Sequence, residues 1–434
     1  MSRTHDLGIV DGLVYLEGTF LEANIYISKG KIVDITTNYY AAKEEYTARE
    51  KWVLPGFIDP HVHFSLNLGK YTSVDDFKTG SISALFGGVT TFIDFLDPIT
   101  TVSEFEKAFS KRLKEAQSSY ADYSFHLTLA NTKESAENFI KKAIESGLPS
   151  IKVFTAYSSS NRKTFDGYLY SLMEAASKYN LTILIHAENE EMIIENVPVY
   201  EHSKARPEMS EITQIIKIAE MVKHTGAKVY IVHTTCGTII EELSLRFKDI
   251  LNEKLFIESC PHYFYFNSEA YLKENGYLYT MTPPLRSKNE QKKLIKNISG
   301  IFSIGTDHCT FNTKEKNKKY TGDIPMGIGG IEHSFILMYT LFGKQIIDKF
   351  TLNPAKMFNL YPRKGTLYPG ADADVVIFNP NYSGFIKSTH TNADYDLYIN
   401  TKVKGKVEKV FKSGNLIIEN EKLVKTAPGN FLRR

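Results

Sequence analysis

The residues Gly56-Phe57-Ile58-Asp59-Pro60-His61-Val62-His63 end a short apolar run, which begins at Trp52, in two histidines one residue apart. If the run is a buried parallel strand, His61 and His63 leave its carboxyl end in extended backbone. Side chains at positions i and i+2 of an extended segment point the same way, so both imidazoles would converge on one point and hold a metal ion there. The alternative is a pair of loop histidines, one of them hydrogen-bonded to Asp59.

Beyond this run, apolar segments alternate with segments of helical periodicity. The apolar segments suit buried strands and span residues 53–58, 90–95, 125–130, 151–154, 182–185, 228–232, 255–259 and 302–305. The helical segments span residues 75–85, 103–117, 133–146, 166–178, 211–224, 239–247 and 289–295. Eight strands alternating with helices over roughly 300 residues predict a (β/α)₈ TIM barrel of the α/β class. A doubly wound open sheet is the alternative, but no Gly-x-Gly-x-x-Gly follows an early strand, so a Rossmann domain has no support.

The two ends of the chain have a different sequence pattern, in which short segments typical of β-strands are separated by turns. They span residues 8–10, 13–15, 23–28 and 31–35 near the start, and 374–378, 407–411 and 415–418 near the end. Chain termini often lie close together, so we expect one small β-sandwich domain built from both. The predicted domains are residues 1–52 with 365–434 for the β-sandwich, and residues 53–364 for the barrel.

Length and composition narrow the class of protein. The chain has 434 residues, which favours one large domain plus a lesser one, and its 24% charged and 42% hydrophobic residues are ordinary for a globular protein. The net charge is +2, and the one dense basic run, residues 314–319, falls in a predicted loop and indicates solvated surface rather than a nucleic-acid site. No apolar stretch approaches the roughly 18 to 20 residues that span a bilayer.

Location is indicated by the start of the chain and by its cysteines. The polar residues 1–6 predict no ordinary secretory signal. Three cysteines, Cys236, Cys260 and Cys309, make no disulfide framework and suit a reducing compartment. We therefore expect a cytoplasmic protein that binds neither nucleic acid nor a membrane.

Candidate chemistry falls at the carboxyl ends of the predicted strands, where barrel enzymes have their active sites. Besides His61 and His63, His186 ends the fifth strand, His233 the sixth and Asp307 the eighth. A single strand-end histidine is more often a packing residue than a ligand, but this many at one barrel mouth indicate a metal site. The mixed imidazole and carboxylate set suits zinc, with iron, cobalt and manganese as alternatives.

Lys152 lies within the fourth predicted strand between Ile151 and Val153, so its ammonium form should be poorly solvated and its pKa lowered. A neutral amine there could form a Schiff base, or it could add carbon dioxide to become a carbamate whose two oxygens bridge two metals. The surrounding histidines favour the carbamate. A structural lysine that extends its amine to water is the remaining alternative.

At these residues the sequence resembles the amidohydrolase superfamily, and within it the cyclic-amidase branch of dihydropyrimidinases (hydantoinases), allantoinases and dihydroorotases. The resemblance covers nearly the whole chain. It includes the further motifs Gly87-Gly88-Val89-Thr90-Thr91, Thr282-Pro283-Pro284-Leu285-Arg286, Asn353-Pro354-Ala355-Lys356, Arg363-Lys364-Gly365 and Gly370-Ala371-Asp372-Ala373-Asp374.

The resemblance implies a centre of two divalent metals, with Zn²⁺ expected. His61 and His63 would bind one metal with Asp307, His186 and His233 would bind the other, and carboxylated Lys152 would bridge them. A metal-bridging hydroxide would attack a ring amide carbonyl. Asp307 would carry the proton to the leaving nitrogen, and Tyr157 would hydrogen-bond the developing oxyanion, unless that tyrosine is only a barrel-rim aromatic.

The resemblance also bears on the substrate. Dihydroorotases have an arginine where this chain has Ser65, so a carboxylate-bearing ring would lose its expected anchor. Met326 stands where hydantoinases usually have asparagine, but in that family this residue and the one at Thr282 contact the ring largely through backbone, so ring binding could survive. We expect a hydrolase that opens a cyclic imide or ureide, either a dihydropyrimidine or a hydantoin.

Other members of the branch give the competing interpretations. A dihydroorotase or an allantoinase is the alternative enzyme. A non-catalytic assembly protein of the same fold is less favoured, because such relatives have lost metal ligands and this chain retains all six. The family also implies a homo-oligomer, expected to be a tetramer.

Overall fold

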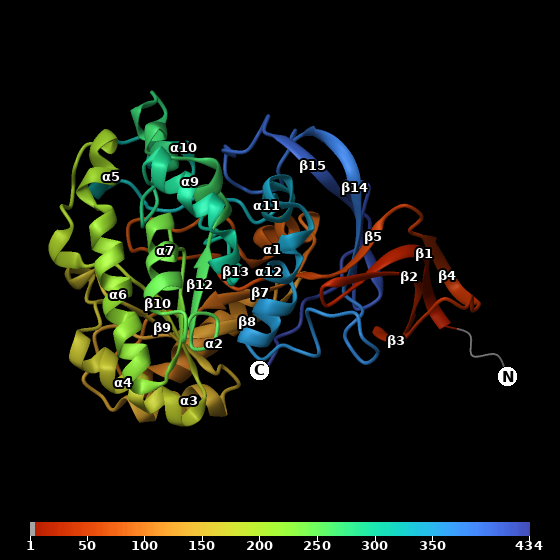
Figure 1. Cartoon of the computed structure of the whole chain (residues 1–434), viewed down its shortest axis with the longest axis horizontal. Coiled ribbons are helices and arrows are strands. Elements are labelled where there is room, and N and C mark those ends of the chain that lie inside the picture. The colour runs from red at the N-terminus through yellow and green to blue at the C-terminus, as the bar shows by residue number, and fades with distance from the viewer. Residues whose placement is uncertain (1–4) are drawn as a thin grey trace.

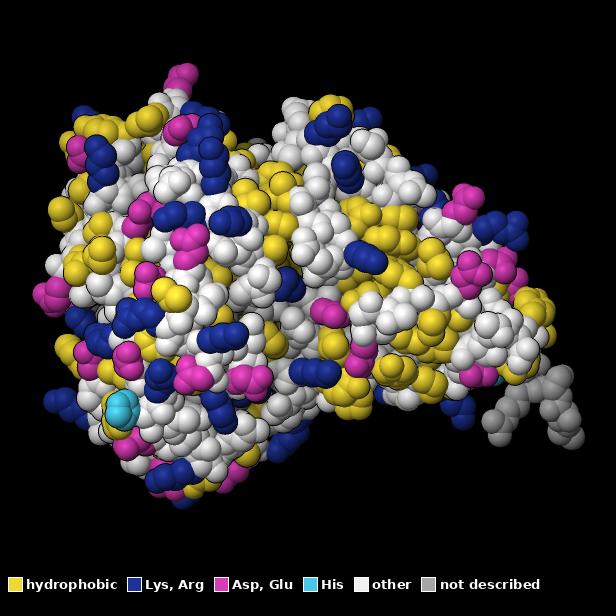
Figure 2. Space-filling view, viewed as in Figure 1, with side chains coloured by type: hydrophobic (Ala, Val, Ile, Leu, Met, Phe, Trp, Pro, Cys, Tyr) yellow, Lys and Arg dark blue, Asp and Glu magenta, His cyan; other side chains and the backbone are white. Residues whose placement is uncertain are grey.

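The computed structural model describes residues 5–434, so most of the polar start on which the secretory-signal prediction rests lies outside the described residues. Figure 1 shows a helix-covered barrel beside a sheet that contains strands from both ends of the chain. Among the described residues, no helix combines the length and apolar character needed to cross a membrane. On the face drawn in Figure 2, basic and acidic side chains are interspersed.

The barrel contains eight parallel strands, each paired with its neighbours in chain order. They are β6 (Phe57–Asp59), β7 (Val89–Phe95), β8 (Asp122–Thr128), β9 (Ser150–Phe154), β10 (Thr182–His186), β11 (Lys228–Ile231), β12 (Leu255–Ser259) and β13 (Ser303–Ile304). The first and last strands meet just beyond their ends, where the Asp307 amide donates to the His61 carbonyl oxygen at 2.9 Å and the His63 amide to that of His308 at 2.9 Å. The predicted TIM barrel is confirmed.

Helices cover the outside of the barrel. Those predicted from periodicity are α1 (Phe77–Phe86), α2 (Phe105–Ala116), α3 (Ala136–Glu145), α4 (Asp166–Tyr179), α6 (Glu208–Thr225), α7 (Gly237–Arg246) and α9 (Lys288–Lys296). Further helices are α5 (His202–Ala205), α8 (Pro261–Tyr265), α10 (Thr313–Lys316), α11 (Ser334–Phe342), α12 (Ile347–Phe350) and α13 (Leu352–Met357). In α4 the buried residues Leu169, Leu172, Met173 and Ala176 form one stripe, and Asn180 ends the helix in the left-handed conformation.

The second sheet joins the two ends of the chain, as predicted. Its order is β17-β16-β15-β14-β5-β1-β2-β3, with β4 also paired to β1. Its strands are β1 (His5–Leu16), β2 (Thr19–Ser28), β3 (Lys31–Thr36), β4 (Ala42–Thr47), β5 (Trp52–Pro55), β14 (Val375–Phe385), β15 (Lys402–Lys412), β16 (Asn415–Glu419) and β17 (Lys422–Leu423). Residues from both ends, including Ile25 and Val375, share one hydrophobic core.

The predicted first barrel strand, residues 53–58, is wrong as one element. It is two strands, because β5 pairs with β1 and β14 in the terminal sheet whereas β6 pairs with β7 in the barrel. The change of sheet occurs at Gly56, where a Cβ would lie 2.2 Å from Thr90 Oγ1. The predicted domain boundary between residues 52 and 53 therefore falls inside β5, and the division into domains stays a prediction.

Candidate active site

A cavity of about 560 Å³ opens at the carboxyl ends of the barrel strands. Its walls contain every site residue that the sequence singles out: His61, His63, Lys152, Tyr157, His186, His233, Thr282, Asp307 and Met326. The volume suits a small organic ligand.

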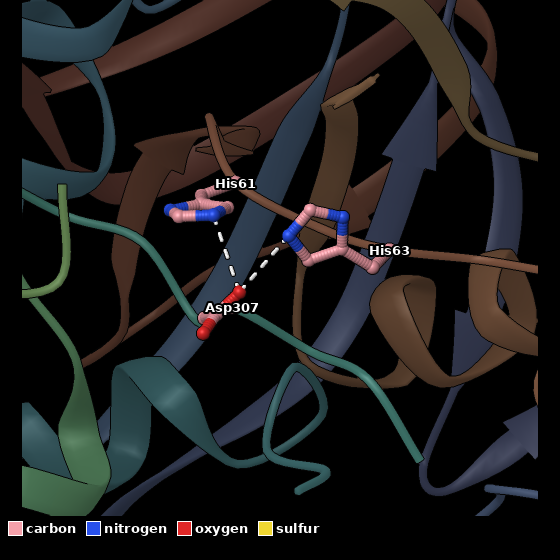
Figure 3. Close-up of side chains that lie close together, drawn as sticks. All are labelled: His61, His63 and Asp307. Carbon is pink, nitrogen blue, oxygen red and sulfur yellow. Dashed lines mark ion pairs between the residues drawn. The ribbon is translucent and has the colours of Figure 1, made fainter. Parts of the chain in front are cut away.

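His61, His63 and Asp307 form a compact group at this mouth (Figure 3). Asp307 Oδ1 lies 3.2 Å from His61 Nε2 and 3.1 Å from His63 Nε2. The candidate ligand atoms all lie within 4.8 Å of one another, which is compatible with one metal ion between them. Burial would raise the pKa of Asp307, but the two imidazoles hold it well below its usual value, so the carboxylate is ionised.

Glu258 fixes the tautomer of His61. The Nδ1 of His61 lies 2.7 Å from Glu258 Oε1, so it carries the proton and leaves the Nε2 lone pair for a metal. The same carboxylate accepts hydrogen bonds from the His233 amide at 2.9 Å and from the Tyr230 hydroxyl at 2.9 Å. Glu258 thus connects the His61 pair with the strand that carries His233.

His186 and His233 form a second pair of facing imidazoles. His186 Nδ1 lies 2.9 Å from His233 Nε2, and both rings are buried. Burial lowers the pKa of each imidazole, which favours their neutral, ligand form. The other nitrogen of His186 donates to Glu188 at 2.8 Å, and Glu188 is in turn held by Arg206 at 3.0 Å, so Nδ1 of His186 is left with its lone pair.

Lys152 is a buried amine without a polar partner. Its Nζ makes no hydrogen bond or ion pair with the described residues and lies 5.5 Å from the ring centre of Phe95 and 5.2 Å from that of Phe154. Burial lowers its pKa to about 8, so a usable fraction is neutral near pH 7. A carbamate forms only on a neutral amine, and this lysine meets that requirement on the wall that also holds the four histidines.

Tyr157 lies in the loop after β9 in the left-handed conformation, with φ of 74°. Its hydroxyl donates to Thr282 Oγ1 at 2.8 Å, and Arg206 Nη2 lies 3.4 Å away. Burial raises the pKa of Tyr157 to about 12, so the phenol stays protonated and can donate a hydrogen bond. His233 and Asp307 are also left-handed, with φ of 41° and 50°. Such backbone strain in non-glycine residues concentrates at functional sites.

Two carboxylates that orient the histidines were not predicted from the sequence. Glu258 could have been noticed in the sequence, because a charged residue inside the apolar run Leu255-Phe256-Ile257-Glu258-Ser259 indicates a functional candidate. Glu188 lies two residues after His186, which is the spacing that places two side chains on the same side of an extended segment. Arg206, which holds Glu188, comes from a separate short segment and had no such signal.

The arginines near the site differ in whether a carboxylate already pairs with their guanidinium group. Arg112 is buried against Asp94 at 2.6 Å, and Arg286 is buried against Glu211 at 2.8 Å, so neither guanidinium is available to a substrate. Arg162 lines the cavity, half-buried, and has no carboxylate partner among residues 5–434.

Comparisons with known proteins identify the family of this chain. The amidohydrolase family model matches residues 52–417. D-hydantoinase of Geobacillus stearothermophilus is 31% identical over 98% of this chain and 96% of its own. The crystal structure of dihydropyrimidinase from Brevibacillus agri NCHU1002 covers 98% of each chain with a TM-score of 0.91 and 26% identity. D-hydantoinase (dihydropyrimidinase) from Thermus sp. covers 99% of each chain with a TM-score of 0.90 and 30% identity.

The family match covers most of the chain, and the similarity to hydantoinases extends beyond it to both ends. Amidohydrolases of this kind have a centre of two divalent metals, and the chain offers a His-His-Asp group for one of them. The chain therefore belongs to the amidohydrolase family, as a hydantoinase-like member of its cyclic-amidase branch.

Proposed function

We propose that this protein hydrolyses the ring amide of a cyclic imide or ureide, either a dihydropyrimidine or a hydantoin. One observation carries the proposal. Two imidazole pairs, an ionised aspartate and a buried lysine that has no polar partner within residues 5–434 line the same cavity as a protonated tyrosine. The relatives named above as hydantoinase and dihydropyrimidinase support the choice of ring.

We assign one metal to His61, His63 and Asp307, and the other to His186 and His233, with carboxylated Lys152 shared between them. Zinc is the metal that this mixture of imidazole and carboxylate donors prefers. Two bound divalent ions would supply the Lewis acidity that activates a water molecule and polarises the substrate carbonyl.

Asp307 moves the proton in this scheme. As the water oxygen bonds to the ring carbonyl carbon, the Asp307 carboxylate accepts a proton from that water. It then gives the proton to the ring nitrogen as the C–N bond breaks. The products are a carboxylic acid and a nitrogen that has gained one hydrogen, so one water is consumed for each ring opened.

Tyr157 and the opposite wall hold the substrate. The Tyr157 phenol donates a hydrogen bond to the carbonyl oxygen as negative charge develops on it. Thr282 and Met326 contact the ring through their backbone. Because both contacts use main-chain atoms, the Met326 side chain need not match the asparagine usual in hydantoinases.

Arg162 gives a specific reason to keep a second candidate. It is a cation in the cavity wall without a carboxylate partner among the described residues, and it could replace the anchor that is missing at Ser65. A dihydroorotase, whose substrate carries a carboxylate, is therefore the alternative, and an allantoinase is less favoured. We also propose that the protein forms a homotetramer. We place it in the cytoplasm, which its three buried, free cysteines support.

The test is hydrolysis of dihydrouracil, hydantoin, dihydroorotate and allantoin by protein prepared with zinc and bicarbonate. We expect about two metal ions per chain and turnover of the uncharged rings. Lys152→Ala should abolish turnover, whereas Lys133→Ala, which changes an exposed lysine, should not. Turnover confined to dihydroorotate and lost in Arg162→Gln would favour the second candidate. Absence of both metal and turnover would contradict both.

Tyr157→Phe tests the oxyanion role separately. The loss of one donor should reduce kcat by roughly 10²- to 10³-fold while the metal content stays the same. An unchanged kcat would instead make Tyr157 an aromatic of the barrel rim.

A further inference from the structure

Lys316 corrects the interpretation of the basic run. Residues 314–319 are predicted to form solvated surface, and Lys314, Lys318 and Lys319 are indeed exposed. Lys316, the last residue of α10, is instead completely buried, with 0% of its surface accessible. A lysine is rarely buried without a carboxylate, yet Lys316 has no ion-pair partner within residues 5–434. Its role must therefore lie in its hydrogen bonds.

The Lys316 amine holds two chain segments together. Its Nζ donates to the carbonyl oxygen of Thr280 at 2.8 Å and to that of Gly327 at 2.6 Å. The same segments are also joined directly, because the Gly327 amide donates to the Thr280 carbonyl at 3.1 Å. Burial lowers the pKa of Lys316 to about 7, but a neutral amine still has two N–H groups, enough for both carbonyls.

Both segments form the wall of the proposed substrate site. Met281 and Thr282 follow directly on Thr280, and Pro325 and Met326 directly precede Gly327, and all four line the cavity. The Tyr157 hydroxyl donates to Thr282 Oγ1 at 2.8 Å, so the phenol borders the same wall. Lys316 itself does not line the cavity.

We propose that Lys316 is a positioning residue, which sets the distance between the Thr282 and Met326 segments and thereby governs how tightly the ring is bound. The inference rests on the proposed function, because it takes the ring to lie against these two segments.

The rest of α10 is anchored without Lys316. Asn312 and Glu315 form a capping box at its start, and the Thr313 amide donates to Asp394 Oδ1 at 2.7 Å. Removing the amine should therefore loosen the wall rather than unfold the helix.

Lys316→Met keeps most of the side-chain length and removes the donors. We expect KM for the ring substrate to rise about tenfold, kcat to change by less than about threefold, and metal content to stay the same. Lys318→Met, in the same basic run but exposed, is the matched control and should leave KM unchanged. An unchanged KM in Lys316→Met, or a parallel loss of kcat and metal, would overturn the proposal.

Hydrogen exchange of the metal-loaded protein gives a second measurement that needs no substrate. Lys316→Met should speed amide exchange in residues 280–282 and 324–327, and the Gly327 amide above all, but not in α10. Unchanged exchange in both segments would overturn the positioning role even if the wild type turned over every ring. If the wild type opens no ring but exchange responds as expected, the proposed function fails while the positioning role of Lys316 stands.

Discussion

Glu258 shows how one buried carboxylate can orient the histidines of a proposed metal site that it does not enter. It accepts from His61 Nδ1 at 2.7 Å and from the His233 amide at 2.9 Å, so it orients one histidine of each pair. Glu258→Gln keeps the shape and an oxygen that can still accept both bonds, but it removes the negative charge beside His61 Nδ1 and puts an NH₂ group in place of the oxygen that accepts from the Tyr230 hydroxyl. We predict a loss of metal affinity of about 10- to 100-fold. Titration with a competing chelator measures it.

The matched control for this prediction is Glu253→Gln, which makes the same change at an exposed position before the same strand. It should leave the metal affinity unaltered. Equal affinities in wild type and Glu258→Gln would mean that the His61 tautomer is set by something other than this carboxylate.

Among individual residues, the sequence predicts the candidate ligands that follow the ends of strands. It does not reveal the residues that act by orienting another side chain. His61, His186 and Asp307 could be found because the carboxyl ends of parallel strands meet at one mouth. The partners of Glu258, His61 and His233, could not be assigned because they follow other strands of the barrel. Glu188 was missed although its partner His186 lies only two residues away in the sequence. Lys316 was misassigned because charge patterning alone cannot reveal that one lysine of a basic run points inward.

At the level of elements, Gly56 controls the passage from one sheet to the other. A Cβ there would lie 2.2 Å from Thr90 Oγ1 and 2.9 Å from Asp374 Cβ, so Gly56→Ala must push β6 away from β7 or from β14. We predict a loss of about 1 to 3 kcal/mol in the free energy of unfolding, the usual cost of overpacking. Urea unfolding measures it.

Gly167→Ala in the first turn of α4 is the control, because a Cβ there meets nothing within 4 Å. This change should be neutral or stabilising, since alanine favours helix over glycine. A Gly56→Ala protein as stable as the wild type would show that the two sheets can separate here without cost.

The helices were predictable because apolar residues recur at helical spacing along long amphipathic segments such as α2 and α4. The division of residues 53–58 into β5 and β6 was not, since an apolar run does not reveal which sheet each of its residues joins. Strand β4 was missed because it has no apolar run at all. Its sequence Ala42-Lys43-Glu44-Glu45-Tyr46-Thr47 is mostly exposed and charged, and only its parallel pairing with β1 makes it a strand.

At the scale of the whole molecule, one buried ion network joins the barrel to the terminal sheet. Lys364 Nζ lies 2.6 Å from Asp122 in β8, 2.6 Å from Asp374 beside β14 and 3.0 Å from Asp372. Burial alone would raise the pKa of Asp122 and Asp372, but Lys364 lowers both, that of Asp372 to about 2. The resemblance suggested Lys364 as part of a family motif, but nothing in the sequence showed that it connects the barrel with the terminal sheet.

Lys364→Met would remove the cation that these three carboxylates share. Asp122 would keep Lys412, and Asp372 would keep Lys31 and Arg363. Asp374 would lose its only ion pair among the described residues, and we predict a loss of about 3 to 5 kcal/mol in unfolding free energy at pH 7. The difference from wild type should shrink as the pH falls. The acids that have lost Lys364 in the variant take up protons first, and below pH 3.8 the wild type loses the contribution of Asp372, whose folded pKa is about 2. Lys31→Met is the control, because Lys31 also pairs with Asp372 at 2.6 Å but is 45% exposed and should contribute less than about 1 kcal/mol. Urea unfolding at pH 7 and pH 4 measures this difference in stability between wild type and Lys364→Met. A difference that stays constant between the two pH values would mean that the network acts through packing rather than charge.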